Sequence, residues 1–554
     1  MRARPPRLAP APVSPFLRER LVVFAMIAAT VVIILAPELR YVPIWDARIY
    51  ADCVIEAAAS GITIESLSCA GHPSQGYLFL LALSQVPRPG NIALMHLTNI
   101  ALGILALGCF RLVLARTFPA REHARQLDLL TLACAVHPVL LSSLLQVNLD
   151  FGVYVFFFAW LAALANGRIA WAAVAGGLLC FSKETGALAY ALTVGLYVAY
   201  EAGGGDEEAR TRRRQLRVAV VFLAIPLALF AAHLVWWNSP HGPSAVWRQA
   251  GQAGPLSGVR LLDFTDPVFR SYAAGIFLLG FGWVMTAILA SDLAVAGTRT
   301  MRRLPDRALP GTAPRQLAFL TTLAVLLTWA LTSFRTWSNL RYFTLLYPLL
   351  ILLSFAALLR LGIPARMRAV ILGGLVSVFL VASYRSVDPV SRAVYGTFSI
   401  GERQMYRMAS LTGEFGGVGL DQLVYNLEFT GYHRVENRLF GILKPTAETV
   451  FAAAWRVRWN VWSQLDSLTY QRTMARERVF APRYADDIEA AVSVATTPEL
   501  WFLEFSNQHD FSSTMRRLCR QYREDRIVSV HARGHILRAH HLVRRAFPAL
   551  SSCT

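Results

Sequence analysis

The sequence predicts a polytopic α-helical membrane protein with a mixed α/β domain at its C-terminal end. Three observations support this fold class: of the 554 residues 55% are hydrophobic, only 16% are charged, and long apolar runs recur along the chain. Soluble domains carry about 25% charged residues. Apolar runs of about 20 residues have the length that crosses the hydrocarbon core of a bilayer.

The charge pattern supports a membrane protein and argues against a nucleic-acid partner. The formal net charge is +19, and Lys183 and Lys444 are the only lysines, so arginine carries nearly all of it. In a soluble protein such basicity would suggest nucleic acid. Here the arginines cluster between the apolar runs, as the positive-inside rule expects of cytoplasmic loops. These clusters are residues 1–20, 111–125, 206–217, 299–315 and 360–368.

The apolar runs predict about eleven membrane-spanning helices, with the amino end in the cytoplasm and the carboxyl end outside. The first run could be a signal peptide, but no A-x-A-like site follows it and it is long for an h-region, which favours an uncleaved first span. The expected spans are residues 21–38, 91–113, 127–146, 150–166, 168–183, 185–201, 217–237, 271–297, 316–334, 340–360 and 368–385.

Residues 74–86 form a shorter run of apolar residues. Runs of about 10–14 residues are more often re-entrant or interfacial than spanning. We therefore expect a juxtamembrane or re-entrant helix here. A crossing at this point would invert the sidedness of every later loop.

This predicted membrane topology divides the chain into three parts: a cytoplasmic tail (1–20), a transmembrane domain (21–385) and a periplasmic domain (386–554). The first periplasmic loop is residues 39–73. The location that follows is a membrane that the chain crosses many times, with the C-terminus on the outer face.

The last part is more polar and carries short apolar or alternating runs. Residues 422–429 and 499–505 have the pattern of strands. A helical pattern at 514–525 and a further strand at 526–543 follow. The resulting strand–helix–strand order predicts a small mixed α/β domain.

Four of the seven cysteines lie in predicted outer segments, two in the first loop and two in the C-terminal domain. An oxidising compartment permits a Cys53–Cys69 and a Cys519–Cys553 disulfide. Free buried thiols are the alternative for each pair. The three cysteines in expected spans are Cys109, Cys134 and Cys180.

Polar residues converge on the outer ends of several expected spans. Asp46, Asp52 and Glu56 open the first loop, but their spacing does not place them on one tight helical face. Ionisable groups near hydrocarbon are costly and tend to be functional. The other members of this set are His72, Asp150, Lys183, Glu184, Arg335, Arg341, Tyr342 and Arg385.

Some of these residues also have a structural interpretation. Asp150 or Arg385 alone could be an interface anchor, and Lys183 and Glu184 could form a local ion pair. Arg335 and Arg341 run against the positive-inside rule, and cations beside the spans suit a phosphate at the headgroup level.

No soluble-enzyme signature competes with this interpretation. The chain has no phosphate-binding P-loop, no G-x-S-x-G and no H-E-x-x-H motif, and the glycine-rich residues 413–419 fit no dinucleotide fingerprint. The histidine-rich residues 531–541 could bind a metal, but their spacing matches no standard site and favours a basic strand. The sequence predicts no cofactor and leaves a divalent metal requirement open.

The ordered motifs resemble those of the GT-C superfamily of polyprenyl-phosphate-sugar-dependent glycosyltransferases, which includes bacterial mannosyltransferases, protein mannosyltransferases and aminoarabinose transferases. An early D-x-x-I-Y in the first outer loop (residues 46–50) is followed by His72–Pro73 and a short apolar helix. Asp150 then begins a later span. The "FSKETGAL" stretch resembles the family's [ST]-K-[EG] turn, and "NLRYFTLLYPLL" its late R-Y-x-x-x-x-x-P span. "HPSQG" replaces the more usual paired prolines, and Ala47 stands where several subfamilies have Glu.

The resemblance implies an inverting sugar transfer from a polyprenyl-phosphate donor to a glycan, lipid or protein acceptor. By position, Asp46 would be the general base on the acceptor hydroxyl. Lys183, Arg335 and Arg341 would hold the leaving phosphate. The substrate-binding residues implied are Tyr50, His72, Asp150, Glu184 and Tyr342.

Two other functions are weighed against this one. An O-antigen polymerase or ligase would concentrate its functional residues in a large late loop, whereas the acids here lie in the first loop. A lipid or solute transporter would show repeats and charges at the midplane, whereas the polar residues here gather at one face.

Overall fold

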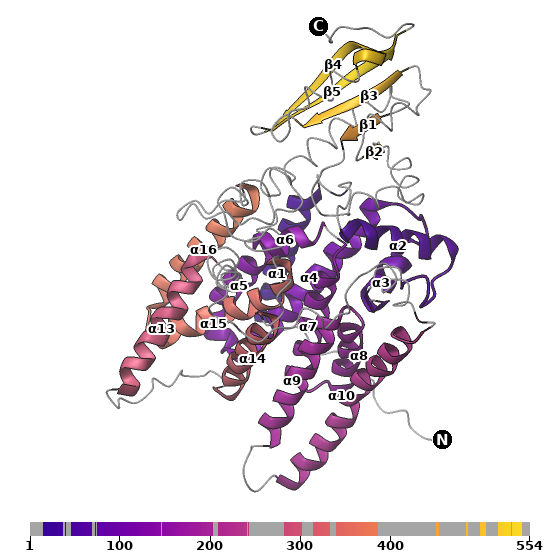
Figure 1. The fold of residues 1–554 in the computed structure, drawn as a ribbon. Coiled ribbons are helices and arrows are strands. Elements are labelled where there is room, and N and C mark those ends of the chain that lie inside the picture. The colour runs from indigo at the N-terminus through magenta and orange to yellow at the C-terminus, as the bar shows by residue number, and fades with distance from the viewer. Residues whose placement is uncertain are drawn as a thin grey trace, which may run out of the picture.

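In the computed structural model, the described residues before 386 are mainly helical, and described residues near the C-terminus form a sheet (Figure 1). The described residues are 15–36, 39, 46–68, 72–73, 75–145, 147–202, 209–240, 242, 282–301, 314–332, 340–385, 450–453, 483–485, 499–505, 519–532 and 535–545.

Fourteen α-helices and one 3-10 helix are assigned within these ranges. In chain order they are α1 (Pro15–Leu35), α2 (Asp46–Ser60), α3 (Gln75–Gln85), α4 (Ile92–Thr117), α5 (Ala120–Ala135), α6 (Pro138–Ser143), α7 (Leu149–Ala165), α8 (Ile169–Cys180), α9 (Glu184–Ala202), α10 (Ala209–Trp237), α13 (Trp283–Met301), α14 (Pro314–Thr332), η3 (Leu340–Phe343), α15 (Leu346–Arg360) and α16 (Ala365–Arg385).

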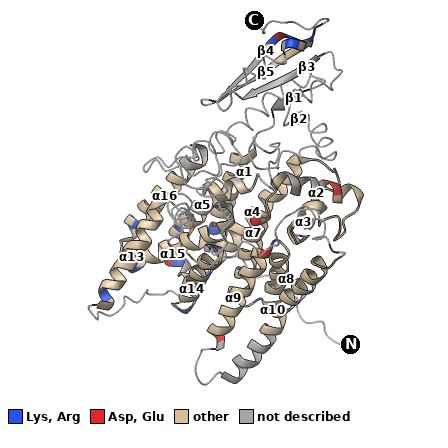
Figure 2. Ribbon diagram, in the orientation of Figure 1, with Lys and Arg blue, Asp and Glu red and all other residues tan. Residues whose placement is uncertain are grey.

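Two helical segments of the described chain are long and apolar enough to cross a membrane: Ile92–Thr117, which is α4, and Ala219–Trp237 within α10. The expected number of crossings stays a prediction. Large apolar side chains are exposed on the outer helices, among them Met26 (64%) and Ile33 (71%) on α1 and Val235 (75%) on α10. Charges are sparse over the described helices (Figure 2). Apolar surface of this extent is typical of a face covered by lipid or by a partner.

Helix α7 forms the centre of the helical part. It packs against α4 and α8, and its side chains are apolar on every side, as expected of a helix enclosed by others. Trp160, Phe157 and Phe158 are fully buried. Its first turn carries Asp150, so the fold holds this carboxylate at the end of a largely buried helix.

The short apolar run forms helix α3, whose 11 residues span about 16 Å at 1.5 Å per residue. This is about half of the roughly 30 Å hydrocarbon core. The helix therefore has the length of the expected juxtamembrane or re-entrant element.

The expected span over residues 127–146 is divided in the structure. Helix α5 ends at Ala135 and α6 begins at Pro138. Proline has no backbone N–H and its ring clashes with the preceding turn, so it begins helices more readily than it continues them. His137 lies in this break, stacked on Tyr347 with ring centroids 4.6 Å apart.

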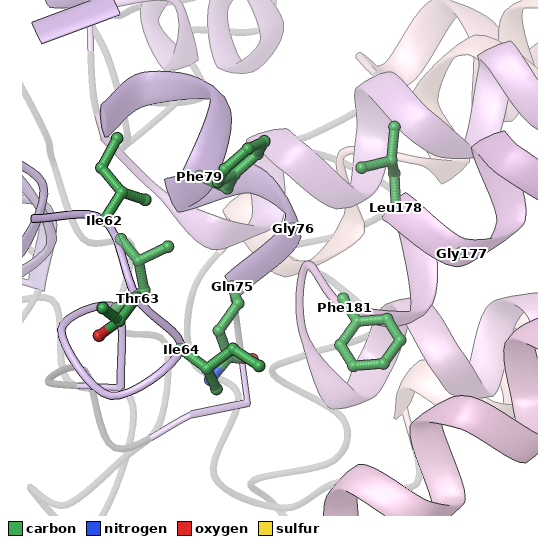
Figure 3. Close-up of a pocket in the computed structure, with 10 residues that line it drawn as sticks. Ile62, Thr63, Ile64, Gln75, Gly76, Phe79, Gly177, Leu178 and Phe181 are labelled. Atoms are coloured by element: carbon green, nitrogen blue, oxygen red, sulfur yellow. The ribbon is translucent and has the colours of Figure 1, made fainter. Parts of the chain in front are cut away.

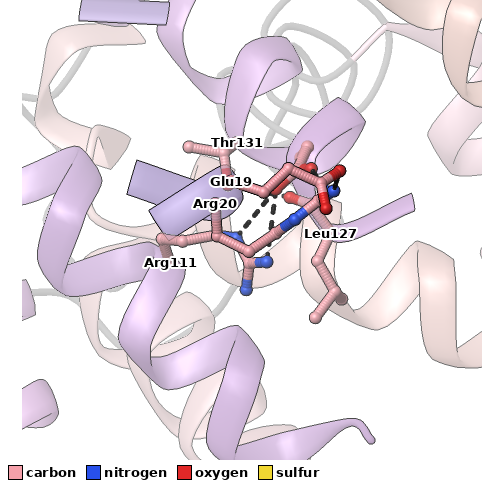
Figure 4. A network of polar contacts seen from close by, with 6 residues as sticks. Glu19, Arg20, Arg111, Leu127 and Thr131 are labelled. Carbon is pink, nitrogen blue, oxygen red and sulfur yellow. Dashed lines mark hydrogen bonds and ion pairs between the residues drawn. The ribbon is translucent and has the colours of Figure 1, made fainter. Parts of the chain in front are cut away.

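A polar network joins α1, α4 and α5 (Figure 4). The membrane topology expected from the sequence places this part of the helices near the cytoplasm. Asp128 accepts hydrogen bonds from Arg20 at 2.5 Å and from Arg111 at 3.2 Å. Arg20 also contacts Glu19. The side chains of Asp128, Arg20 and Arg111 are each 15% exposed, so the two pairs with Asp128 are screened less by water than surface ion pairs.

The C-terminal strands form a five-stranded mixed sheet in the order β2-β1-β3-β5-β4. Strands β1 and β2 and strands β1 and β3 are parallel, whereas β5 is antiparallel to both β3 and β4. The strands are β1 (Val450–Ala453), β2 (Arg483–Ala485), β3 (Glu499–Phe505), β4 (Tyr522–Ala532) and β5 (His535–Arg544).

The sheet corrects two expectations. Residues 526–543 are divided between two antiparallel strands of a hairpin, and the end of the expected helix at 514–525 belongs to β4. In the sequence, only Arg-Gly stands between the two strands, and a two-residue Gly-containing connection favours a hairpin. The strand expected at 422–429 lies outside the described residues.

Cys53 and Cys519 each take part in a disulfide bond. Their expected partners, Cys69 and Cys553, lie outside the described residues. Within the described chain the free cysteines are Cys109, Cys134 and Cys180.

Candidate functional site

The centre of the candidate site is an ion pair between Lys183 and Asp150. Lys183 Nζ donates to Asp150 Oδ1 at 2.8 Å, and the two side chains are only 9% and 7% exposed. Asp150 lies in the first turn of α7, where the positive end of the helix dipole favours a carboxylate. Lys183 lies in the short corner between α8 and α9. Burying two charges costs several kcal/mol per ion unless they are well paired, so this close contact is needed to hold them there.

A segment far along the chain completes the surroundings of this pair. Lys183 Nζ lies 4.5 Å from the centroid of the Tyr342 ring, within the range of a cation–π interaction. Thr344 Oγ1 donates a hydrogen bond to the backbone carbonyl of Asp150 at 3.2 Å. Tyr342 belongs to η3, as does Arg341. The fold therefore brings the late R-Y motif to the corner between α8 and α9 that carries Lys183, which is called the lysine corner below.

A second pair lies beside the first. His72 Nδ1 is 3.1 Å from both carboxylate oxygens of Glu184, and the side chains are 37% and 23% exposed. Glu184 begins α9 and directly follows Lys183. One corner of the chain thus presents a cation to the interior and a carboxylate to the partly open side.

A backbone hydrogen bond holds the start of α3 against the end of α8. The N–H of Gly76 donates to the carbonyl of Phe181 at 2.8 Å. A Cβ at Gly76 would meet the Leu178 carbonyl at 3.0 Å and Phe181 Cβ at 3.1 Å. The absence of a side chain at position 76 therefore lets the start of α3 approach the end of α8, which places His72 beside Glu184.

The acidic helix of the first loop is adjacent to this framework. Asp46 is the first residue of α2, and Tyr50, one turn later, is 6% exposed. Helix α2 packs against α3. The side chains of Asp46 and Asp52 lie outside the described part of the chain, and Glu56 is exposed.

The remaining expected site residues are only partly described. Arg335 lies outside the described residues. Arg341 and Arg385 have described backbones, in η3 and at the end of α16, but not described side chains. Sequence reasoning missed Thr344 and Gly76, because neither carries charge.

The histidine-rich stretch of residues 531–541 is the part of the sequence that suggested metal binding. Within the described residues, no group of three or more His, Cys, Asp or Glu side chains is arranged to hold a metal ion. His540 and His541 lie in β5, and their Nδ1 atoms contact Glu524 at 2.6 Å and Asp525 at 3.0 Å. These histidines are therefore cross-strand partners of β4 carboxylates.

Comparison with known proteins gives structural neighbours only. No family model and no curated protein matches the chain. ArnT from Cupriavidus metallidurans bound to undecaprenyl phosphate aligns at 14% identity and a TM-score of 0.49, covering 94% of this chain and 97% of that one. The apo state of the same protein aligns at 15% identity and a TM-score of 0.48, covering 94% and 98%. Undecaprenyl phosphate is a polyprenyl phosphate.

Proposed function

We propose that this chain is an integral-membrane glycosyltransferase that moves a sugar from a polyprenyl-phosphate donor to an acceptor at the periplasmic face, with inversion. One observation carries the proposal. Polar residues from four separate segments of the sequence meet at one corner of the helical part. They are His72, Asp150, the adjacent Lys183 and Glu184, and Tyr342.

Lys183 is suited to the leaving phosphate. An ammonium has three N–H donors, so its contact with Asp150 is compatible with a second contact to a phosphate oxygen. Cations positioned at developing negative charge lower the barrier because they need not reorganise during the reaction. Arg335 and Arg341 are the further cations of this proposal. Arg341 belongs to η3, the segment that brings Tyr342 to Lys183, and Arg335 precedes that segment in the sequence.

Asp46 is the proposed general base. An alcohol is a poor nucleophile until a positioned carboxylate takes its proton. The acceptor oxygen would attack the anomeric carbon from the face opposite the phosphate. The new carbon–oxygen bond would form as the bond to the phosphate oxygen breaks, and the acceptor proton would pass to Asp46.

The remaining residues would position substrate hydroxyls. His72 and Glu184 face the open side of the corner, and Tyr50 lies on the helix that starts with Asp46. Asp150 would orient Lys183 through their hydrogen bond, and the Tyr342 ring would cover the ammonium group. These roles require no cofactor.

The proposed location is the inner membrane of a bacterium, with several spans and the C-terminal sheet on the periplasmic side. The exposed apolar side chains of α1 and α10 support burial of these helices in lipid. The donor chain would then remain in the bilayer while the reacting atoms lie at its surface.

The experiment is sugar transfer in membranes that contain the full-length protein, with radiolabelled hexoses and pentoses linked to polyprenyl phosphate as donors. Wild-type membranes should transfer one of these sugars and release polyprenyl phosphate. Asp46→Asn should abolish transfer, whereas the neighbouring Asp52→Asn should retain it. Transfer by Asp46→Asn at the wild-type level would remove the base from the proposal, and no transfer by wild-type membranes from any donor would contradict the function.

A further inference from the structure

The described helices have two features that suit a ligand besides the lysine corner itself. One is an open groove of about 430 Å³ between the loop after α2, the start of α3 and the end of α8 (Figure 3). Its wall is almost entirely apolar, and Phe181, which lines it, lies two residues before Lys183. The groove therefore belongs to the site already described. The other feature shares no residue with it and lies where α5 and α16 begin.

Helices α5 and α16 begin with the same short pattern. Residues 119–123 read PAREH and residues 364–368 read PARMR. Each helix starts at the alanine that follows the proline, as suits a residue that has no N–H to donate. The N–H groups of His123 and Arg368 donate to the carbonyls of Pro119 and Pro364, at 3.1 and 2.9 Å. His123 and Arg368 therefore take the same place in the first turn of their helices.

The two helices run side by side in the same direction. Helix α5 packs against α16. At one end, Ser383 Oγ of α16 donates to the carbonyl of Val136, the residue after α5, at 2.8 Å. At the other end, the charge of Arg368 acts on His123. Both N-termini, with their unpaired N–H groups and the positive ends of their dipoles, therefore lie at the same end of the pair.

The imidazole of His123 is buried at this end and no hydrogen bond of the described chain uses it. Its side chain is 9% exposed, and its ring packs edge to face on Phe355 of α15 with centroids 5.6 Å apart. Phe118 packs on the same phenylalanine at 4.9 Å. Nδ1 is buried without a partner, whereas Nε2 is not enclosed in this way. Nε2 is therefore the ring nitrogen that a ligand can reach.

The guanidinium of Arg368 is held in place by a tight turn. Gly362 has a φ of 72°, and the Ile363 N–H donates to the carbonyl of Leu358 at 3.1 Å. The Ile363 carbonyl then accepts from Arg368 Nη1 at 2.5 Å. Nε is buried without a partner, and within the described ranges no ion pair joins this arginine to a carboxylate. A half-buried cation without a counter-ion is costly, and Nη2 is left to donate elsewhere.

The electrostatics at the two helix starts favour an anion. His123 precedes the expected span at 127–146; burial lowers its pKa, the charge of Arg368 lowers it further, and Glu122 opposes them. The first turns of the helices also carry exposed arginines, namely Arg121, Arg125 and Arg366. Glu122, itself exposed, is the acid among these residues. An anion between the two starts would offset this excess of positive charge.

We propose that the starts of α5 and α16 bind a phosphate group between them, with Arg368 Nη2 and His123 Nε2 as hydrogen-bond donors. Phosphate oxygens are acceptors that match a guanidinium and the N-terminus of a helix. The expected membrane topology places residues 111–125 and 360–368 at the cytoplasmic face, where lipid phosphates and soluble phosphates both occur. The proposal is independent of sugar transfer.

Binding can be measured on the purified full-length protein after removal of lipid in a neutral detergent. The first association constant is determined by native mass spectrometry for dioleoylphosphatidylglycerol and by calorimetry for inorganic phosphate. Arg368→Gln should lower it about tenfold or more, the loss expected for one hydrogen bond to a charged group. His123→Phe, which keeps a ring on Phe355, should lower it about two- to tenfold. Arg366→Gln makes the same change of charge at an exposed position and should stay within about twofold.

A second measurement needs no variant that might fail to fold. The pKa of His123 is followed by NMR in the wild type, in a buffer without phosphate, and each probe is then added. Bound phosphate should raise this pKa, because a nearby negative charge favours the protonated ring.

The two probes distinguish the source of the phosphate. Binding of phosphatidylglycerol alone would assign the site to a lipid headgroup, and binding of inorganic phosphate with the same dependence on Arg368 would assign it to a soluble anion. Equal losses for Arg366→Gln and Arg368→Gln would show attraction by diffuse charge and overturn the proposal. An unchanged His123 pKa with both probes would overturn it as well.

Discussion

Removing one side of the Lys183–Asp150 pair should be more damaging than removing both. Asp150→Leu removes the carboxylate partner of an ammonium that is 9% exposed, and Lys183→Met removes the cation from a carboxylate that is 7% exposed. Breaking a buried ion pair in this way costs about 3–5 kcal/mol, whereas replacing both partners with apolar residues of similar volume is often neutral. The double variant should therefore be more stable than either single variant.

The free energy of unfolding can be compared by titrating the purified protein from mild detergent into dodecyl sulfate and following the tryptophan signal. If the two singles each lose about 3–5 kcal/mol and the double variant loses less than either, the coupling exceeds 3 kcal/mol. Losses that add within about 0.5 kcal/mol are those of independent sites. Additive losses would refute the inference that these two charges hold each other in the core.

Two further predictions concern the lysine corner and the sidedness of the membrane. Gly186→Ala should reduce sugar transfer and stability, because a Cβ at this position would lie 2.2 Å from the Leu179 carbonyl and must move the α8–α9 corner; Gly195→Ala, in open space on the same helix, is the control, and normal activity of Gly186→Ala would contradict the corner's role. Glu122→Cys, an exposed position at the start of α5, should resist a membrane-impermeant maleimide in intact cells and react after lysis. Reaction in intact cells would show that α3 crosses the membrane and that the threading is inverted.

The charged residues of the site could be predicted because ionisable groups are costly next to long apolar runs. Asp150, Lys183 and Glu184 stand out for this reason, and the structure brings them together with His72. Their pairing could not be predicted. Adjacent residues suggested a local pair, but Lys183 pairs with a residue 33 positions away and Glu184 with one 112 positions away.

Features without charge were the ones that sequence reasoning missed. Gly76 is an ordinary residue in a helix start, and only the packing of α3 on α8 gives it a role. The β4–β5 hairpin was read as one strand because both halves share a basic, alternating pattern. Its signal was Gly534, which follows the first apolar stretch where a two-residue connection is favoured.

In the proposed mechanism, Asp46 takes the proton of the acceptor. The most direct measurement is single-turnover transfer by purified protein saturated with donor, comparing the wild type with Asp46→Asn, together with donor binding by each. Loss of a positioned general base should slow the chemical step by about 10²–10⁴-fold, while donor binding stays close to that of the wild type. An Asp46→Asn rate close to the wild-type rate would contradict the claim.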